Sequence, residues 1–316
     1  MEGEATVSAP EIAAAVLLTD AEPHTPEWHQ ARAGGIGASE IAAIAGLHTT
    51  WDSPTSIYHR KRGELPAKDD EMRLRFGTFA EPFIAGEWAR AHPGHEVVSG
   101  RGVWVSRERP WQRASPDRFV VLGGEVAGVL ELKAGSRHDG WGEDGSDDIP
   151  VHYRAQVQWQ MDVLGVPLAH VAAYLDGREL RCYTIDYDPA DAKLLRDIGW
   201  EFWQRVLDGD PPPLDALPAT TRALKARWTG AEDAEVQVPA TMARQYRAAL
   251  AAERRAAERK TLAVNRLLER LGDARYAVHD GQRLAVRSVY DRKGYTVRPK
   301  TGIVSLRPVE QKETSE

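Results

Sequence analysis

Cysteine is almost absent from this chain of 316 residues, because Cys182 is the only one. A single thiol excludes a disulfide framework, a cysteine-based zinc site and an iron–sulfur cluster held by four thiolates of this chain. It also fits a reducing compartment. Long hydrophobic runs are missing too, since no apolar segment approaches the roughly 20 residues that cross a bilayer. The first 20 residues carry acids where a secretory signal carries Lys or Arg, so we expect a soluble intracellular protein that does not bind membranes.

Basic residues are scarce over most of the chain but concentrated near its C-terminus. Residues 1–240 hold 24 basic and 38 acidic side chains, whereas residues 241–308 hold 16 basic and 6 acidic ones. This asymmetry predicts a basic arm on an acidic body. The arm fits a polyanionic partner such as DNA, although an exposed helix is often rich in Arg simply to stay soluble. Its Ala-rich face also fits close packing against another subunit or a partner protein, so the choice between DNA and protein stays open.

Hydrophobic residues make up 42% of the chain, enough for a sizeable core, and the length suggests about two domains. The pattern predicts an α+β fold with a central mixed β-sheet flanked by helices, followed by a C-terminal helical arm. We expect a flexible tail with one short helix over residues 1–25, a core over 26–210, a linker over 211–238, and a basic arm with a small β-hairpin and a tail over 239–316. Strand-like runs occupy residues 97–98, 103–105, 119–122, 126–133, 169–174 and 180–185.

Two helical patterns are relevant to the site. Residues 73–91 place Leu74, Phe76, Phe79, Phe83, Ile84 and Trp88 mostly on one side, which predicts a buried helical face. The glycines around residue 35 predict a turn, after which Ser39 is a candidate N-cap of a second helix.

The residues with the clearest chemistry are Ser115-Pro116-Asp117 and Glu131-Leu132-Lys133, with a predicted hairpin between them. The hairpin can return Asp117 to the side of Glu131, and strand alternation places Glu131 and Lys133 on one face. Two carboxylates about 4 Å apart repel by several kcal/mol, so both stay ionised only if a cation lies between them. Oxygen ligands suit Mg²⁺ or Mn²⁺, and Lys133 can orient or help deprotonate a metal-bound water and offset phosphate charge. The alternative is a surface hairpin with ordinary solvated charges.

Two further segments support a metal site. Glu81 lies beside an otherwise apolar helical face, where an unpaired acid is costly unless a lysine or a metal compensates it. Tyr153, Gln156 and Gln160 share one helical stripe, and a glutamine can bridge a water and a phosphate. Each feature also has a purely structural explanation. Glu81 can be an exposed acid beside a core face, and the stripe can belong to a mildly polar helix.

In this order the motifs resemble the YqaJ-type viral recombinases, phage exonucleases similar to lambda exonuclease within the PD-(D/E)xK nuclease superfamily. The resemblance covers roughly residues 26–208. The residues that carry it are Trp28, Arg32, Gly35-Ile36-Gly37-Ala38-Ser39, Gly77, Glu81-Pro82, Ser115-Pro116-Asp117, Glu131, Lys133, Ile149-Pro150, Tyr153 and Gln156-Val157-Gln158.

The resemblance implies a restriction-endonuclease-like core and a Mg²⁺-dependent nuclease, for which Mn²⁺ can substitute, that degrades duplex DNA from a 5′ end. It implies Asp117, Glu131 and the backbone carbonyl of Leu132 as metal ligands, with Lys133, Glu81 and Gln156 as further catalytic residues. It assigns binding of DNA or its terminal 5′ phosphate to a separate set, namely Arg32, Ser39, Ser115 and Tyr153. A single-strand annealing protein as partner, a ring-shaped trimer, and a phage or prophage gene expressed in the cytoplasm of a bacterial host also follow from the resemblance.

Four points stay open at this stage. A structure-specific or restriction-like endonuclease would use the same metal chemistry, and a non-catalytic DNA-binding protein could keep the fold, although it would have little reason to keep all of Asp117, Glu131 and Lys133. The acidic loop 139–148 repels DNA unless it points away or moves, and Trp141 within it either stacks on a base or anchors the loop.

Overall fold

The structure is a computed structural model that describes residues 10–47, 50–66, 72–135, 139–230 and 232–289. The chain divides into two compact units, Met1–Trp228 and Thr229–Glu316. The predicted boundary was a linker over 211–238. Within that range, helix α7 (Pro218–Arg227) contacts α3 (Pro54–Lys61) and therefore belongs to the first unit.

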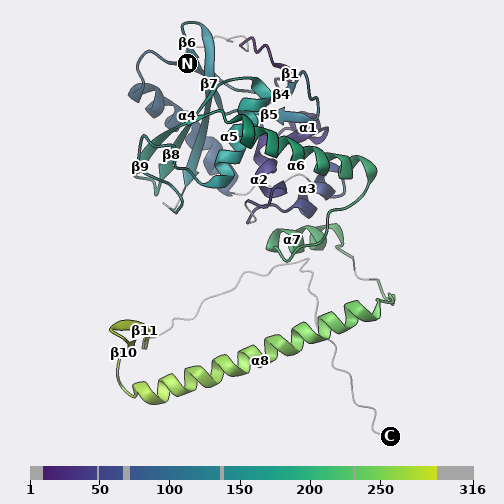
Figure 1. Cartoon of the computed structure of the whole chain (residues 1–316), viewed down its shortest axis with the longest axis vertical. Coiled ribbons are helices and arrows are strands. Elements are labelled where there is room, and N and C mark those ends of the chain that lie inside the picture. The colour runs from purple at the N-terminus through teal and green to yellow at the C-terminus, as the bar shows by residue number, and fades with distance from the viewer. Residues whose placement is uncertain (1–9, 48–49, 67–71, 136–138, 231, 290–316) are drawn as a thin grey trace. The chain divides into compact units, whose positions relative to one another are not determined.

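A five-stranded mixed sheet forms the centre of the first unit (Figure 1). Its strands lie in the order β3 (Glu96–Ser99), β6 (Arg118–Leu122), β7 (Glu125–Gly135), β8 (Leu168–Leu175) and β9 (Glu179–Asp186). Neighbours are antiparallel except β7 and β8, which are parallel. Because parallel strands need a crossover, the chain passes through helix α5 (Val151–Leu164) between them. The predicted α+β class with a central mixed sheet flanked by helices is confirmed.

The predicted hairpin is formed by β6 and β7, and it turns at Gly123 and Gly124. Both glycines have positive φ values, 62° and 88°, which a two-residue turn between twisted strands requires. The turn sets the register in which Arg118 lies opposite Leu130. One residue further along each strand, Asp117 and Glu131 therefore reach the same level.

A second sheet has the order β1 (Ala15–Thr19), β4 (Val103–Ser106), β5 (Gln112–Ala114) and β2 (Ile36–Gly37). The expectation of a flexible tail with one short helix over residues 1–25 is wrong for its second half, because β1 pairs antiparallel with β4. The strand is short, and Val16 and Leu18 are exposed while Ala15 is buried, so its pattern is weak. Residues 1–9 lie outside the described part of the chain.

Helices cover both faces of the central sheet (Figure 1). Helix α4 (Met72–Ala91) packs Ile84 and Trp88 against Leu132 of β7 on one face. Helix α5 packs Trp159 against Val171 of β8 on the other face. Strand alternation explains this division, since Leu132 and its neighbour Glu131 must point to opposite sides of the sheet.

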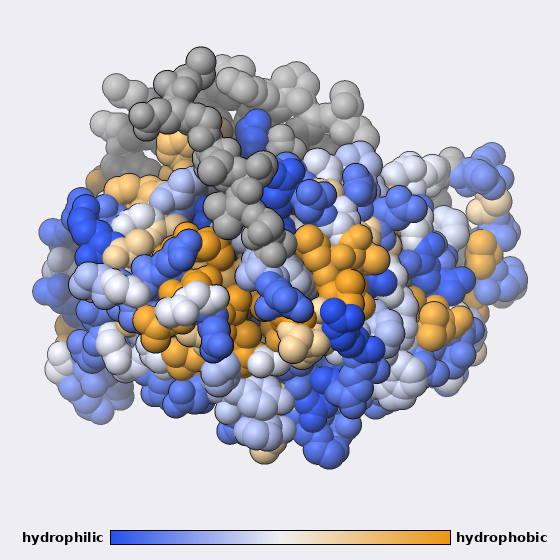
Figure 2. Space-filling view, turned by 90° about the horizontal axis from the view of Figure 1, so that it is seen from above, coloured by the Kyte–Doolittle hydropathy of each residue, from blue (hydrophilic) through white to orange (hydrophobic). Residues whose placement is uncertain are grey.

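The buried face predicted for residues 73–91 is only partly correct. Ile84 and Trp88 are buried, but Phe76, Phe79 and Phe83 are 54%, 79% and 53% exposed. The six positions span too wide an arc for one sheet contact, and the small Ala80 and Ala85 pack against the sheet instead. The side chain of Leu74 lies outside the described residues. Figure 2 shows hydrophobic patches among hydrophilic side chains on one face of the molecule.

The remaining helices of the first unit are α1 (Pro26–Ala33), α2 (Ala38–Ile44), α3 and α6 (Pro189–Asp208). Ser53 caps α3 through the Ser56 N–H, and Pro54 follows it at the first helical position. The N-cap of α2 is Gly37 and not the predicted Ser39, because Glu40 accepts the Gly37 N–H and fixes the start of the helix there.

The second unit contains one long helix, α8 (Ala240–Leu271), and the hairpin of β10 (Tyr276–His279) and β11 (Gln282–Val286). Both were expected from the sequence. The predicted tail beyond residue 289 lies outside the described residues. Among the residues that the structure describes, no helix combines the length and the hydrophobicity that a membrane span needs.

Candidate active site

The acids that the sequence singled out meet where β6 begins, because Asp117 directly precedes β6 and Glu131 lies within the neighbouring strand β7. Asp117 Oδ2 accepts the backbone N–H of Leu132 at 2.7 Å, so this carboxylate lies against β7 beside Glu131. Glu131 is only 3% exposed, and the side chain of Leu132 points into the core on the opposite face. The predicted proximity of Asp117 and Glu131 is therefore confirmed.

Glu131 is held by three donors. Its Oε1 accepts from Lys133 Nζ at 2.6 Å and from Gln156 Nε2 at 2.5 Å. Its Oε2 accepts from Gln160 Nε2 at 2.7 Å. The two glutamines come from one stripe of α5, since they are four residues apart. The buried carboxylate thus has a fixed orientation as well as a counterion.

Lys133 remains a cation in this setting. Burial alone would lower the pKa of Lys133, but the negative charge of Glu131, with smaller contributions from Tyr153 and Asp117, raises the pKa above its ordinary value. Nζ also lies 3.2 Å from Gln156 Oε1 and 4.6 Å from the centre of the Tyr153 ring. Lys133 is therefore a hydrogen-bond donor and a source of positive charge, not a proton acceptor.

The site has more negative charge than its cations balance. Burial, then the nearby Glu131, raises the pKa of Asp117 well above its usual value, against the opposing effect of Lys133. Burial also raises the pKa of Glu81, which is subject to attraction from Arg118 and repulsion from Glu131. Three carboxyl groups from α4, β6 and β7 thus share one electrostatic environment. A further cation would relieve this repulsion.

The donors fit a hard divalent ion, although they do not form a ready-made cage. Among the described residues, no three His, Cys, Asp or Glu side chains are already arranged around one metal position. Asp117, Glu131 and the Leu132 carbonyl are nonetheless all oxygen donors, which Mg²⁺ and Mn²⁺ prefer. Mg²⁺ keeps several waters, so it needs few protein ligands. Gln160 Oε1 is fully buried and has no hydrogen-bond partner among the described residues, so the site also offers an unsatisfied acceptor.

A second polar group surrounds the start of α2. Arg32 donates to Ser39 Oγ at 2.9 Å, which brings two of the predicted phosphate-binding residues into contact. Glu40 follows Ser39 on α2, and its Oε2 lies 2.7 Å from Lys61 Nζ, with both side chains buried. Burial lowers the pKa of Arg32, and burial likewise lowers the pKa of Lys61 to about 8 despite the attraction of Glu40.

Arg113 on β5 connects this group to the acids. It donates to the Gly34 carbonyl at 2.9 Å. Because Asp117 follows only four residues later, the α-carbons of Arg113 and Asp117 are at most about 14 Å apart. Ser115 lies between them in the chain and is half-buried. The two groups therefore belong to one region of the protein.

Tyr153 and the acidic loop are packed together. Trp141 stacks on Tyr153 with ring centroids 5.4 Å apart and also touches Tyr183. The loop is tied to the edge of β9, where Asp144 Oδ1 accepts the Cys182 N–H at 2.7 Å. Trp141 therefore anchors the loop, which resolves one of the open choices. The described loop residues lie along the outer strand.

Several residues of the two groups were missing from the predicted site. Gln160 was placed on the stripe of Tyr153 and Gln156 but was given no role. Glu40, Lys61, Arg113 and Arg118 were not predicted at all. Their partners lie on other elements, and Lys61 is 29 residues from the Arg32 carbonyl to which it donates. No local pattern encodes such a contact.

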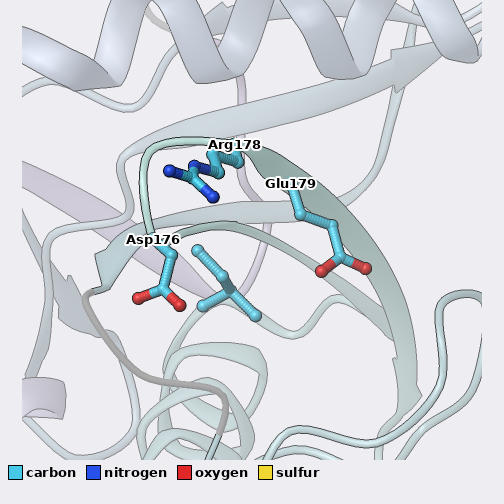
Figure 3. Close-up of a pocket in the computed structure, with 4 residues that line it drawn as sticks. Asp176, Arg178 and Glu179 are labelled. Atoms are coloured by element: carbon cyan, nitrogen blue, oxygen red, sulfur yellow. The ribbon is translucent and has the colours of Figure 1, made fainter.

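A separate hollow lies at the turn between β8 and β9. Figure 3 shows Asp176, Arg178 and Glu179 around it, together with Leu175. The Asp176 N–H donates to the Gly135 carbonyl at 2.9 Å, so this hollow begins beyond the end of β7. None of the predicted site residues lines it.

Comparison with known families confirms the predicted resemblance. Residues 27–167 match the family model of the YqaJ-like viral recombinase domain. The matched segment includes the acids on β6 and β7, the glutamines of α5 and the group around Arg32. No curated protein matches the chain.

Solved structures of exonucleases are among those similar to this chain. An alkaline exonuclease from Laribacter hongkongensis is 20% identical, with 59% of this chain and 94% of that chain covered and a TM-score of 0.46. A structure of the exonuclease LHK-Exo in complex with dAMP has the same identity and coverage and a TM-score of 0.48. A phage-related exonuclease from Haemophilus somnus 129PT is 9% identical, with 55% and 96% covered and a TM-score of 0.40.

Proposed function

We propose that this protein is a divalent-metal-dependent deoxyribonuclease that degrades linear duplex DNA from its 5′ ends. The observation that carries the proposal is the group where β6 begins beside β7. There Asp117 lies beside a buried Glu131 that is bound by Lys133 and by two glutamines of α5. The family match over residues 27–167 supports the same assignment.

Asp117, Glu131 and the Leu132 carbonyl would hold the metal. Bound there, Mg²⁺ would supply positive charge to the scissile phosphate and make a coordinated water more acidic. The raised pKa values of Asp117 and Glu81 support this role, because burial, and for Asp117 then Glu131, disfavours the ionised carboxyl groups and a bound cation would stabilise them. Gln156 and Gln160 keep Glu131 in one orientation during turnover.

Lys133 acts as a fixed cation in the reaction. Because its pKa is raised, it stays protonated and donates hydrogen bonds. We infer that it orients the attacking water and stabilises the charge that develops on the phosphate oxygens. Hydrolysis then adds the elements of water across the P–O bond and leaves a 5′ phosphate and a 3′ hydroxyl.

The group around Arg32 would bind the terminal 5′ phosphate. An arginine fork meets phosphate oxygens through two parallel hydrogen bonds, and the Ser39 hydroxyl beside it adds a further donor. Lys61 contributes positive charge, and Arg113 connects the group to the strand that leads to Ser115 and Asp117. Occupation of this group by the end of a strand would position the next phosphodiester bond at the acids.

The cellular setting belongs to the same proposal. An exonuclease of this kind leaves a single strand, which a single-strand annealing protein can bind, and phage recombination in a bacterial cytoplasm combines the two activities. The support is the match to a viral recombinase domain.

The experiment that tests the proposal is digestion of labelled duplexes during a magnesium titration. The substrates are linear duplexes with a 5′ phosphate or a 5′ hydroxyl, labelled at either end, and a covalently closed circle. We expect mononucleotides from the 5′-phosphorylated ends, slower release from the 5′ hydroxyl ends, an intact circle, and no reaction with EDTA. Rapid cutting of the circle would support the endonuclease instead, and DNA binding without cleavage at any magnesium concentration would overturn the nuclease assignment.

A further inference from the structure

Helix α8 is long, but nothing in the described part of its unit buries it. It runs for 32 residues, about 48 Å at 1.5 Å per residue, and none of its residues is buried. Most helical stability in proteins comes from packing an apolar face, so a helix of this length without a covered face calls for a partner. Its apolar side chains include Met242, Tyr246 and Val264, which are 55%, 43% and 43% exposed.

Six apolar and two charged residues of α8 together follow the spacing of a coiled coil. Steps of four and three residues alternate along Tyr246, Leu250, Glu253, Ala257, Lys260, Val264, Leu267 and Leu271. A seam with this spacing faces a second helix along its whole length. We call these eight positions the α8 seam. Strand β10 touches the end of α8, where Leu267 and Leu271 are half-buried. Leu250 is half-buried as well, and the other five positions of the seam are exposed.

The opposite side of α8 is basic. The helix carries Arg244, Arg247, Arg254, Arg255, Arg259 and Arg266, all of which are exposed. By helical spacing Arg244, Arg255, Arg259 and Arg266 lie on the side away from the seam, whereas Arg247 and Arg254 flank it. A partner on the seam would therefore leave the arginines on the far side in solvent.

Two opposite charges interrupt the seam, and they define the orientation of the partner. Glu253 and Lys260 are seven residues apart on either side of the small Ala257. If two copies of α8 paired in parallel, Glu253 would meet Glu253 and Lys260 would meet Lys260, which is unfavourable. If they paired antiparallel about Ala257, each Glu253 would come within reach of the other copy's Lys260. The small Ala256 and Ala257 at the crossing would allow close approach.

We propose that α8 pairs with α8 of a second copy of this chain as an antiparallel coiled coil with two reciprocal Glu253–Lys260 ion pairs. The pairing places apolar residues of one half of each helix against those of the other half. It leaves both basic faces outward. The inference stands independently of the nuclease assignment, because it uses no residue of the catalytic group.

Charge reversal in the full-length chain tests the proposal. Glu253→Lys places four positive charges in the seam of a pair, and Lys260→Glu places four negative ones. We expect each variant alone to raise the dissociation constant of the α8-dependent association at least about tenfold, measured by sedimentation equilibrium. An equimolar mixture of the two variants should restore association, because a lysine-only seam then meets a glutamate-only seam. The double variant, with both charges exchanged in one chain, should also associate like the wild type.

Two controls make the outcome specific. Glu269→Lys reverses a charge on the basic side of the same helix and should leave the association unchanged. Circular dichroism of each variant should match that of the wild type at a concentration so low that the wild type is also unpaired, because Glu and Lys have similar helix propensities. Single variants that associate like the wild type, a mixture that does not recover, or a wild-type chain that stays monomeric at about 100 μM would each overturn the proposal.

Cysteine cross-linking reports the orientation directly. In a Cys182→Ser background, mixing Glu253→Cys with Lys260→Cys chains should give a mixed disulfide between the two variants. Glu253→Cys alone should give little. Efficient cross-linking of Glu253→Cys to itself would indicate a parallel pair and contradict the proposal.

Discussion

At the scale of single residues, the protein holds more acidic charge where β6 begins beside β7 than it can neutralise. Asp117 bears most of this cost, because burial and Glu131 both raise its pKa. A raised pKa of an acid means that the ionised form is less stable in the folded state than in the unfolded state. The free energy of unfolding therefore falls as the pH rises above the ordinary pKa of an aspartic acid, and the loss is still present at neutral pH. Without a cation, the ionised Asp117 therefore destabilises the folded state, and a bound cation would remove this cost.

Asp117→Asn separates these two roles. The amide keeps an oxygen for the Leu132 N–H but removes the repelled charge, so we expect the melting temperature without divalent ions to rise above that of the wild type at pH 7. Cleavage of linear duplex should fall by about 100-fold or more, because the metal ligand that we propose is lost. Differential scanning calorimetry and a cleavage assay measure the two effects. A destabilised variant with normal activity would return Asp117 to a structural role.

Gln160 is predicted to position Glu131. Gln160→Leu removes the donor to Glu131 Oε2 and should lower kcat about tenfold with little change in KM, since the carboxylate then moves. Gln158 on the same helix is a matched control, because it is equally buried but binds the Asp186 carbonyl. Gln158→Leu should reduce stability and leave kcat near that of the wild type. Equal loss of activity in both variants would show that the effect comes from disturbance of α5.

The central triad of Asp117, Glu131 and Lys133 could be predicted from sequence because a short hairpin joins its parts. A two-glycine turn fixes the register, and the register fixes which side chains meet. Lys61 and Glu40 could not be predicted in this way. Their ion pair joins α3 to α2, and the sequence contains no local signal for that packing.

At the scale of elements, α4 is attached to the sheet through an aromatic and imidazole cluster. The Trp88 ring stacks on His92 at 4.1 Å and lies 4.9 Å from His170 of β8 and 5.8 Å from His95. Burial, with the nearby His92 and His95, lowers the pKa of His170 to about 4. The neutral imidazole is therefore part of the packing between α4 and the sheet.

This cluster predicts an acid-sensitive contact. The unfolded chain binds a proton on His170 near pH 6.5, whereas the folded chain does so only near pH 4, so stability falls as the pH drops between these values. The loss amounts to at most about 3 kcal/mol by pH 4. We expect the difference in urea unfolding free energy between pH 7 and pH 4.5 to be smaller in His170→Asn than in the wild type.

The exposed His279 supplies the control for this prediction. Its side chain is 80% exposed, so His279→Asn should show the wild-type dependence on pH. If His170→Asn and His279→Asn lose stability in parallel as the pH falls, the cluster is not the source of the acid sensitivity.

Regular elements were predicted well where the hydrophobic period is strong and poorly where it is not. The strands around the hairpin and the long helices follow the sequence pattern closely. Strand β1 was not predicted because two of its apolar residues face solvent. Three phenylalanines of α4, which the pattern assigned to the core, also face solvent. Periodicity reports that side chains share a face, but it does not report whether that face is covered.

At the scale of the whole molecule, the uneven charge along the chain suggests that the two units have different roles. The first unit holds the catalytic candidates, and the second holds the basic side of α8. Phosphate contacts by arginines bind DNA without reading its bases and release counterions. The second unit would thus contribute affinity and not specificity.

Replacing Arg254, Arg255 and Arg259 with Gln in the full-length chain tests this assignment of roles. We expect weaker DNA binding and a plot of log affinity against log salt that is shallower by about 2–3 units, at roughly 0.9 per lost phosphate contact. Fluorescence anisotropy across a salt series measures the slope. An unchanged slope would mean that the basic side of α8 does not touch DNA.

The most direct test of the account is manganese binding by the protein without DNA, measured by titration calorimetry on the wild type and on Asp117→Asn. The account predicts saturable binding of Mn²⁺ to the wild-type chain and its loss in the variant, while the fold of the variant is intact. Equal binding by the two proteins, or none by the wild type, would contradict the claim that Asp117 and Glu131 form the cation site on which the proposed nuclease depends.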